Sequence, residues 1–369
     1  MANKTAKLGD LATYINGYAF KPADWGDTGL PIIRIQDLTG NSYQLNRYDG
    51  GYPERIEVND GDVLISWSAS LGVYVWQRGK ALLNQHIFKV VFDKLPVNKD
   101  YFVFAVEHKL AEMESKTHGA TMKHIVKKDF DGTTIPYPPI EKQAEIADHL
   151  RRITSLIDRQ TEQLLLLNQL VKSRFIELFA SVEAEDTLQN LCTFIDYRGK
   201  TPEKVESGLP FITAKNIRMH RMSFDTLEYI SKETYDRVMT RGFPQIGDVV
   251  FTTEAPLGNV CRIPFIETEF YIGQRIITMQ TERLEPAYLE YALSSDEFKR
   301  KIAEKSSGST VTGIRSKLLE QLTIPVPPRA LQERFAAFVE QTDKSKLAVQ
   351  KGLQELEILK KSLMQQYFG

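Results

Sequence analysis

Side chains able to read nucleic-acid bases follow two similar apolar stretches of this chain. Arg34 and Gln36 come after the first stretch, and Lys215, Asn216 and Arg218 come after the second. An arginine can bond guanine through two hydrogen bonds, and an asparagine or glutamine can bond adenine in the same way. If the chain binds DNA, the difference between the two sets predicts two different base preferences.

Further polar and basic residues stand at equivalent places in the two halves of the chain. The hydroxyls and cations of the segments 121–128 and 310–317 suit contacts with phosphate, which fix register without specifying sequence. His86 and Arg275, each beside a shared glutamine, are candidates for a variable base reader. The alternatives are an ordinary solvated loop and, for the two shared glutamines, a cap on a buried turn. The candidates are Trp67, Ser68, Gln85, His86, Thr121, Lys123 and Lys127 in the first half, and Arg198, Lys200, Thr253, Gln274, Arg275, Thr310, Thr312, Arg315 and Lys317 in the second.

Catalytic motifs are not encoded by these residues. Residues 135–139 superficially resemble the Asn-Pro-Pro-Tyr motif of adenine methyltransferases but lack its asparagine, and Gly199-Lys200-Thr201 lacks a phosphate-binding loop's first glycine, because Phe194 stands there. Cys192 and Cys261 have no neighbouring ligand at metal-binding spacing, and the six histidines are scattered. The sequence predicts a non-catalytic protein with neither metal nor cofactor.

The length and the charge of the chain limit its possible functions. The chain has 369 residues, more than one domain usually needs. Residues 1–138 contain 16 basic and 16 acidic residues, and residues 188–327 contain 18 of each. A protein that holds DNA mainly by neutralising phosphates has a basic excess, so DNA would have to be read by local patches or held with a more basic partner. The first residues lack an apolar run, which predicts a cytoplasmic protein without a membrane segment.

A tandem duplication organises the whole chain. Residues 135–139 and 324–328 share the pattern Ile-Pro-x-Pro-Pro, followed in each case by a glutamine, Gln143 or Gln332. Gly-Leu-Pro occurs at 29–31 and 208–210, and Gly-Asp-Val occurs at 61–63 and 247–249. The repeat predicts four parts, at 1–138, 139–186, 187–327 and 328–369, in which a globular domain and a long helix alternate.

The globular domains have the pattern of an α/β or α+β fold. We expect strands at 31–35, 63–66, 87–92, 249–252 and 276–280, and helices at 99–115 and 286–305.

The two long helices are amphipathic. Their apolar residues recur at steps of three and four, the spacing of a coiled-coil seam, and a helix of this length extends ~57 Å. One small domain cannot cover such a stripe, so we expect the helices to pair antiparallel, with pseudo-twofold symmetry; the alternative is packing of each helix on its own domain. The predicted seam is Ile146, Leu150, Ile153, Ile157, Leu164, Leu167 and Val171 with Phe335, Val339, Val349, Leu353 and Leu356.

The repeated order of domain, Ile-Pro-x-Pro-Pro-x-x-x-Gln and helix resembles the specificity subunit of type I restriction-modification systems. The resemblance covers essentially the whole chain and includes Leu8-Gly9-Asp10-Leu11 and the segment 197–202. It implies two target-recognition domains that each read half of a bipartite, asymmetric site in double-stranded DNA. It also implies helices that separate the domains and bind two DNA methyltransferase subunits, which hold the methyl donor, and restriction subunits can join them. A coiled-coil adaptor without DNA readout is the alternative function.

Overall fold

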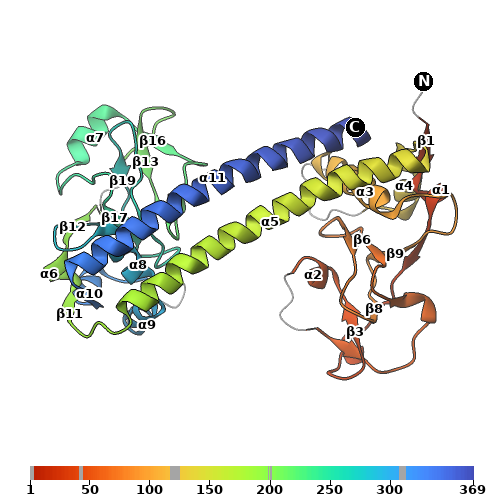
Figure 1. Cartoon of the computed structure of the whole chain (residues 1–369), viewed down its shortest axis with the longest axis horizontal. Coiled ribbons are helices and arrows are strands. Elements are labelled where there is room, and N and C mark those ends of the chain that lie inside the picture. Colours follow the sequence, from red (N-terminus) through yellow and green to blue (C-terminus); the bar gives the residue numbers. More distant parts are fainter. Residues whose placement is uncertain (1–3, 41–44, 117–124, 198, 200–201, 307–312) are drawn as a thin grey trace. The chain divides into compact units, whose positions relative to one another are not determined.

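The computed structural model describes residues 4–40, 45–116, 125–197, 199, 202–306 and 313–369. The chain divides into two compact units, Met1–Thr161 with Gln350–Gly369 and Glu162–Val349. Each unit contains one globular domain, together with part of α5 (Ile140–Phe179) and part of α11 (Arg329–Phe368) (Figure 1). Among the described residues, no helix is both long and apolar enough to cross a membrane.

The first domain has two small sheets of four strands. Their strand orders are β2-β9-β6-β7, which is antiparallel, and β4-β3-β8-β5, in which β3 and β8 are parallel; β1 pairs with β10 separately. The elements are β1 (Thr5–Lys7), α1 (Leu8–Leu11), β2 (Thr13–Asn16), η1 (Pro22–Asp24), β3 (Leu30–Ile33), α2 (Ile35–Leu38), β4 (Arg47–Tyr48), η2 (Glu54–Ile56), β5 (Glu57–Val58), β6 (Val63–Ser66), β7 (Gly72–Val75), β8 (Ala81–Leu83), β9 (Ile87–Val91), α3 (Lys99–Lys116), α4 (Lys127–Gly132) and β10 (Thr134–Pro136).

The second domain repeats this plan. Its sheets have the orders β12-β20-β17-β18 and β16-β13-β19, with β11 paired to β21 and β14 paired to β15. The duplication predicted from the sequence is therefore confirmed in the strand topology. The elements are β11 (Glu185–Thr187), α6 (Leu188–Leu191), β12 (Thr193–Asp196), β13 (Leu209–Ile212), η3 (Ala214–Asn216), β14 (Ile217–Arg218), β15 (Arg221–Met222), β16 (Glu228–Ile230), α7 (Lys232–Val238), β17 (Val249–Thr252), β18 (Val260–Arg262), β19 (Tyr271–Ile272), β20 (Ile276–Gln280), α8 (Pro286–Ser294), α9 (Asp296–Lys305), α10 (Ser316–Glu320) and β21 (Thr323–Pro325).

The repeated Gly-Asp-Val motif is a turn that starts a central strand. Gly61 and Gly247 both have φ near +92°, a conformation that glycine adopts without strain. Asp62 accepts a hydrogen bond from the backbone of Asn59 at 2.9 Å, and Asp248 accepts one from Gln245 at 2.7 Å. The motif recurs because both domains need the same turn.

The repeated glutamine joins each long helix to its domain. The side-chain oxygen of Gln143 accepts from the Asn98 backbone at 2.9 Å while its amide donates to Pro138 at 2.9 Å. Gln332 makes the equivalent bonds to Glu285 and Pro327 at 2.9 and 2.8 Å. Both glutamines are almost fully buried, so these bonds satisfy backbone groups that water cannot reach.

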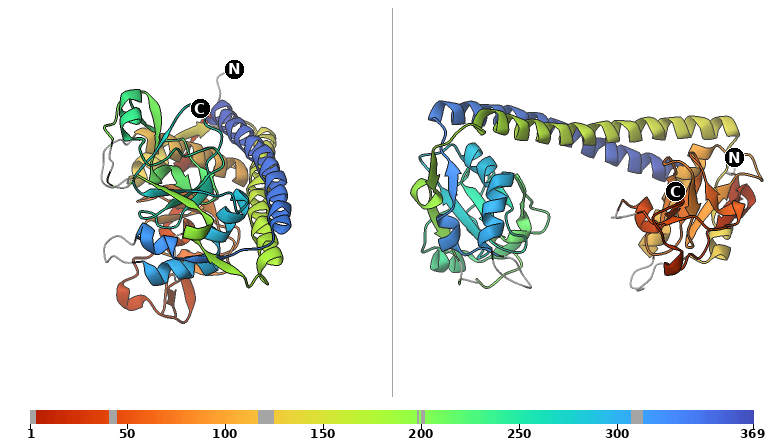
Figure 2. Two further views of the ribbon diagram at one scale, coloured as in Figure 1. Left: turned by 90° about the vertical axis from the view of Figure 1, so that its left-hand side faces the viewer. Right: turned by 90° about the horizontal axis from the view of Figure 1, so that it is seen from below.

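The long helices pack together antiparallel, as predicted. Gln160 of α5 lies beside Gly352 of α11 in the first unit, and Phe175 of α5 packs on Phe335 of α11 in the second, with ring centroids 5.5 Å apart. Residue numbers therefore rise along one helix as they fall along the other. Figure 2 shows the two helices side by side against the domain of each unit. All twelve predicted seam residues are buried or half-buried.

The end of each long helix packs on the other repeat's domain. Phe368 of α11 is fully buried against Tyr101 in the first unit, with ring centroids 5.2 Å apart. Phe179 of α5 packs equivalently on Tyr288 in the second unit at 4.8 Å. The domain cores are thus continuous with the helix pair, and packing of each helix on its own domain alone is excluded.

The helix expected at 286–305 is wrong in one respect, because two helices occupy this stretch. Ser295 has an extended backbone, with φ −62° and ψ 151°, and its side chain accepts from the Phe298 backbone. This is a helix N-cap, so α8 ends and α9 begins at this residue. Strands β6, β17 and β20 have the bounds expected from the sequence.

Candidate nucleic-acid interface

Four strands of the first domain end at one place. β2 and β6 both end against the first residues of β9, and the parallel strands β3 and β8 end together. The segments that leave these strands therefore start at a common edge of the domain. We define edge 1 as residues 17–20, 34–36, 67–70 and 84–86. Edge 1 contains six predicted candidates: Arg34, Gln36, Trp67, Ser68, Gln85 and His86.

The second domain builds the same edge from β12, β17, β13 and β19. β12 and β17 end against the first residues of β20, while β13 and β19 are parallel and end together. We define edge 2 as residues 213–216, 253–258 and 273–275. The predicted candidates Lys215, Asn216, Thr253, Gln274 and Arg275 lie on it. The sequence paired these residues correctly, but only the strand register shows that they meet.

The same backbone hydrogen bond closes each edge. The amide of Trp67 donates to the carbonyl of His86 at 3.3 Å, and the amide of Thr253 donates to that of Arg275 at 2.9 Å. The side chains at these matched positions differ. His86 packs edge-on against the half-buried Trp67 ring, with centroids 5.1 Å apart, whereas Thr253 is almost fully buried and Arg275 is exposed.

Arg275 forms an ion pair that has no counterpart in edge 1. Its Nε atom lies 3.0 Å from a carboxylate oxygen of Glu254, and the two side chains are 52% and 42% exposed. Ser68 and His86 occupy the matching positions. Nothing in the sequence predicts that Glu254 meets Arg275, because the two residues are 21 positions apart in the chain.

Two candidates have structural partners in place of an open surface. Asn216 is buried, with its oxygen accepting from Thr213 and its amide donating to Ser223 and Thr226. These bonds hold the turn after β13, so we leave Asn216 out of the proposed reading set. Arg34 has a side chain that is 17% exposed and lies 3.6 Å from Asp37. Gln36, Lys215 and Arg218 are exposed.

A third segment joins each edge just before α4 or α10. The amide of Ile125 donates to the carbonyl of Trp67, and that of Ile314 donates to Thr253, both at 3.0 Å. The cations that follow are exposed: Lys127 in the first domain, and Arg315 and Lys317 in the second. Lys127 also lies 2.6 Å from Asp131 and 5.6 Å from the ring centre of Tyr14. Thr121, Lys123, Arg198, Lys200, Thr310 and Thr312 lie outside the described residues.

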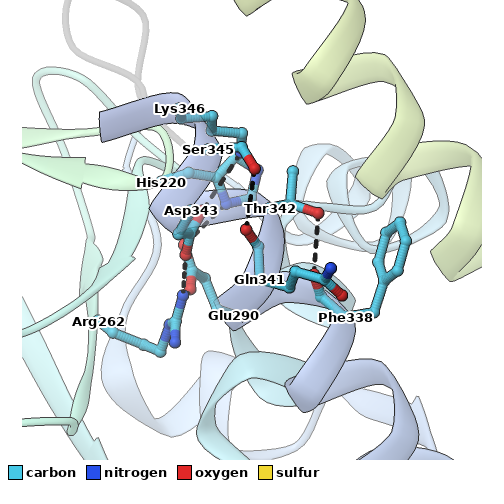
Figure 3. Close-up of polar contacts among 9 residues, drawn as sticks. All are labelled: His220, Arg262, Glu290, Phe338, Gln341, Thr342, Asp343, Ser345 and Lys346. Carbon is cyan, nitrogen blue, oxygen red and sulfur yellow. Dashed lines mark hydrogen bonds and ion pairs between the residues drawn. The ribbon is translucent and has the colours of Figure 1, made fainter. Parts of the chain in front are cut away.

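A cluster of charges, also unforeseen from the sequence, holds the second domain on α11 (Figure 3). The buried carboxylate of Glu290 lies 2.6 Å from Arg262 and 2.8 Å from a ring nitrogen of His220, and Arg262 also reaches Asp343 of α11 at 2.9 Å. Burial opposes the charge on Arg262, but Glu290 and Asp343 together raise the pKa of its guanidinium. The cluster lies at the end of β18 that is opposite edge 2, so its contacts are structural.

Neither cysteine is placed for nucleophilic chemistry. Burial raises the pKa of Cys192 and of Cys261 to about 12, so both stay protonated thiols near neutral pH. Among the residues that the structure describes, no three histidine, cysteine or acidic side chains are grouped to hold a metal ion.

Comparison with known proteins places both repeats in one family. Residues 2–169 and 186–358 match the model described as "Type I restriction modification DNA specificity domain". The chain is 23% identical to the "Type I restriction enzyme MjaVIII specificity subunit" of Methanocaldococcus jannaschii, over 98% of this chain and 91% of the relative. It is 24% identical to the "Type I restriction enzyme EcoBI specificity subunit" of Escherichia coli, over 90% of this chain and 78% of the relative.

Solved structures share the fold over the whole length. The crystal structure of a type I restriction-modification S subunit from M. genitalium has a TM-score of 0.59 at 15% identity, covering 99% of this chain and 96% of that one. A second chain, from a study of complex assembly and conformational transition of the type I system, has a TM-score of 0.57 at 18% identity, with 99% and 97% covered. The resemblance seen in the sequence is confirmed.

Proposed function

Since the chain belongs to the type I restriction modification DNA specificity family, with the domain present twice, we propose that edge 1 and edge 2 each read one half of a bipartite DNA site. The chain is a DNA specificity subunit and is itself non-catalytic. The site is asymmetric in this proposal, because the two edges have different side chains at matched positions.

The observation that carries the proposal is the repeated convergence of four strand ends with unlike side chains. Both edges rest on the same backbone bonds, so their segments start from equivalent places. The readers then differ, with Trp67 and His86 on edge 1 and Glu254 and Arg275 on edge 2. Exposed Lys127, in one domain, and Arg315 and Lys317, in the other, are suited to phosphate contacts that set register.

The helices are proposed to separate the two half-sites and to bind two methyltransferase subunits. Large apolar side chains on both helices stay exposed: Leu347 by 68%, Ile358 by 63% and Leu165 by 57%. Leu166 and Leu170, one helical turn apart on α5, are also exposed, and contiguous exposed apolar surface marks binding sites for other proteins. The methyl donor is proposed to bind the partner subunits, restriction subunits can join, and the complex acts in the cytoplasm, where chromosomal DNA is.

We propose the part limits 1–138, 139–186, 187–327 and 328–369 for use in domain exchange. The limits after 138 and 327 are supported by the end of β10 at Pro136 and the start of α5 at Ile140, and by the corresponding positions Pro325 and Arg329. The limit after 186 falls within β11, which begins at Glu185.

A map of methylated bases in the source genome tests the function, with the gene intact and then deleted. Loss of one gapped, two-part motif upon deletion is expected. An unchanged map would contradict the proposal and favour an adaptor role without DNA readout. Replacing residues 187–327 with the second domain of another family member should change one half of the motif and leave the other half and the gap unchanged.

The spacer role has its own test. Seven residues inserted into α5 after Thr161, and seven into α11 before Gln350, lengthen the pair between the two compact units. Seven residues keep the coiled-coil register and add ~10 Å of helix. A longer gap with both half-sites retained is expected, whereas an altered half-site would argue against this division of roles. The same insertion in α5 alone, which disrupts the pairing, is the control.

A further inference from the structure

We propose that Arg275 reads a guanine in the half-site of the second domain and that Glu254 is the residue that positions it. This inference rests on the proposed function and makes it more specific. The readout belongs to edge 2 alone.

The guanidinium has the geometry to bond the carboxylate and a base at once. Its ion pair with Glu254 engages Nε at 3.0 Å. A two-bond contact with O6 and N7 of guanine can use the two terminal nitrogens of the same planar group. One carboxylate can therefore fix the plane of the guanidinium group without occupying the terminal nitrogens that bond the base. A guanidinium group that is already fixed loses less side-chain entropy when it binds the base.

The backbone on both sides of the pair is also fixed. The carbonyl of Arg275 accepts from the amide of Thr253, and Glu254 forms a bridge with Gly313. Gly313 allows this close approach, because a Cβ atom at its position would lie 3.2 Å from the carbonyl oxygen of Thr253. Hydroxyl and backbone bonds of Thr252 to Asn259 close the loop that carries Glu254. The pair is thus held before DNA binds, and preorganisation of this kind favours discrimination.

Charge and exposure favour a nucleic-acid ligand over a purely structural pair. Arg275 is 52% exposed, and an exposed ion pair contributes little to stability. Arg315 and Lys317 are exposed on the segment that joins the same edge, where they can offset the charge of Glu254 beside phosphate. In edge 1 the matching residues, Ser68 and His86, cannot form such a pair.

The test uses the full chain assembled with its modification subunits on a DNA library in which each position of the second half-site is randomised. Methylation is then measured by sequencing, as a total rate and as a preference at every position. Arg275→Ala should reduce the preference for guanine at one position roughly ten-fold or more and leave the other positions unchanged. Arg275→Lys should keep the charge but lose most of this preference. Glu254→Gln should weaken the same preference without changing which base is preferred.

Arg283→Ala is the matched control. Arg283 follows the other end of β20, is 54% exposed and pairs with Asp186 at 3.1 Å, so its loss should leave every base preference unchanged. A uniform loss of methylation with Arg275→Ala, without relaxation of a guanine, would show a phosphate contact and overturn the inference. An unchanged motif would overturn it as well, and an unchanged preference with Glu254→Gln would remove the positioning role. If the unsubstituted complex methylates no two-part motif, the proposed function itself fails.

Discussion

The side chain of Arg262 lies with its Nε atom 2.6 Å from the carboxylate of Glu290, which is only 2% exposed. In the first domain the equivalent positions are Val75, which pairs with Val63 as Arg262 pairs with Val249, and Val103 on α3. The charged contact between the second domain and α11 is thus built at positions where the first domain has two valines, of which Val75 is exposed. The two domains can therefore be destabilised by different substitutions.

Arg262→Val should destabilise the second domain by about 3 kcal/mol, because it leaves a buried carboxylate without its main cationic partner. Thermal unfolding combined with hydrogen exchange of residues 286–294 would measure the change. Arg283→Ala, which breaks an exposed pair, should cost no more than about 1 kcal/mol. A cost of the same small size for Arg262→Val would contradict the prediction.

The double variant Arg262→Val with Glu290→Val reproduces the residues of the first domain at these positions and provides the control. Removing both charges leaves no unpaired buried carboxylate, so the double variant should be more stable than Arg262→Val alone. Additive losses would show that Glu290 does not depend on Arg262.

Gln332→Leu should destabilise the second unit by about 2 kcal/mol, since it leaves the Glu285 amide and the Pro327 carbonyl without their buried partner. Gln143→Leu should do the same in the first unit. Denaturant unfolding with domain-resolved exchange would separate the two effects. Gln163→Leu, an exposed position of α5, should change stability little, and an equal loss there would mean that the effect belongs to the helix and not to the hydrogen bonds.

The repeat made most of the architecture predictable from the sequence. Motifs that occur twice have a shared structural cause, such as the positive φ of Gly61 and Gly247. The spacing of apolar residues in α5 and α11 predicts which face of each helix is buried. The break at Ser295 was missed because the apolar pattern continues through it, although serine is a preferred N-cap.

The site was predictable only in part, because it depends on strand register. The matched loops identified His86 and Arg275 as candidates. Nothing in the residue spacing shows that Glu254 meets Arg275, or that the side chain of Asn216 bonds the backbone of its own turn. Such contacts join residues that are distant in the chain. Tyr101 and Tyr288 occupy equivalent positions of the two repeats, so the sequence alone could have identified them as a shared structural feature. Their hydroxyls donate to the carbonyls of Pro136 and Pro325, at 2.8 and 2.6 Å.

Glu185 should make the second domain sensitive to acid. Hydrogen bonds from Lys301 and Thr323 hold the pKa of its carboxyl below the ordinary value of 4.5. Its stabilising effect is therefore fully present above that value and is lost as the pH falls through the lower, folded-state pKa. The difference in Tm between the unsubstituted chain and Glu185→Gln should shrink when the pH is lowered from about 7 to about 3. Glu183→Gln, at an exposed position before β11, should show a smaller difference at pH 7. A difference that grows in acid would reverse the assignment.

Phe368 and Phe179 should each stabilise the domain of the opposite repeat. Phe368 is fully buried against Tyr101, and Phe179 is 4% exposed and packs on Tyr288. Phe368→Ala should therefore cost about 3 kcal/mol and raise hydrogen exchange in α3, whereas Phe179→Ala should raise it in α8. Each variant is the control for the other, because the two side chains are alike and the affected domains differ. If Phe368→Ala instead loosened α8 and left α3 protected, the exchange of helix ends between the repeats would be refuted.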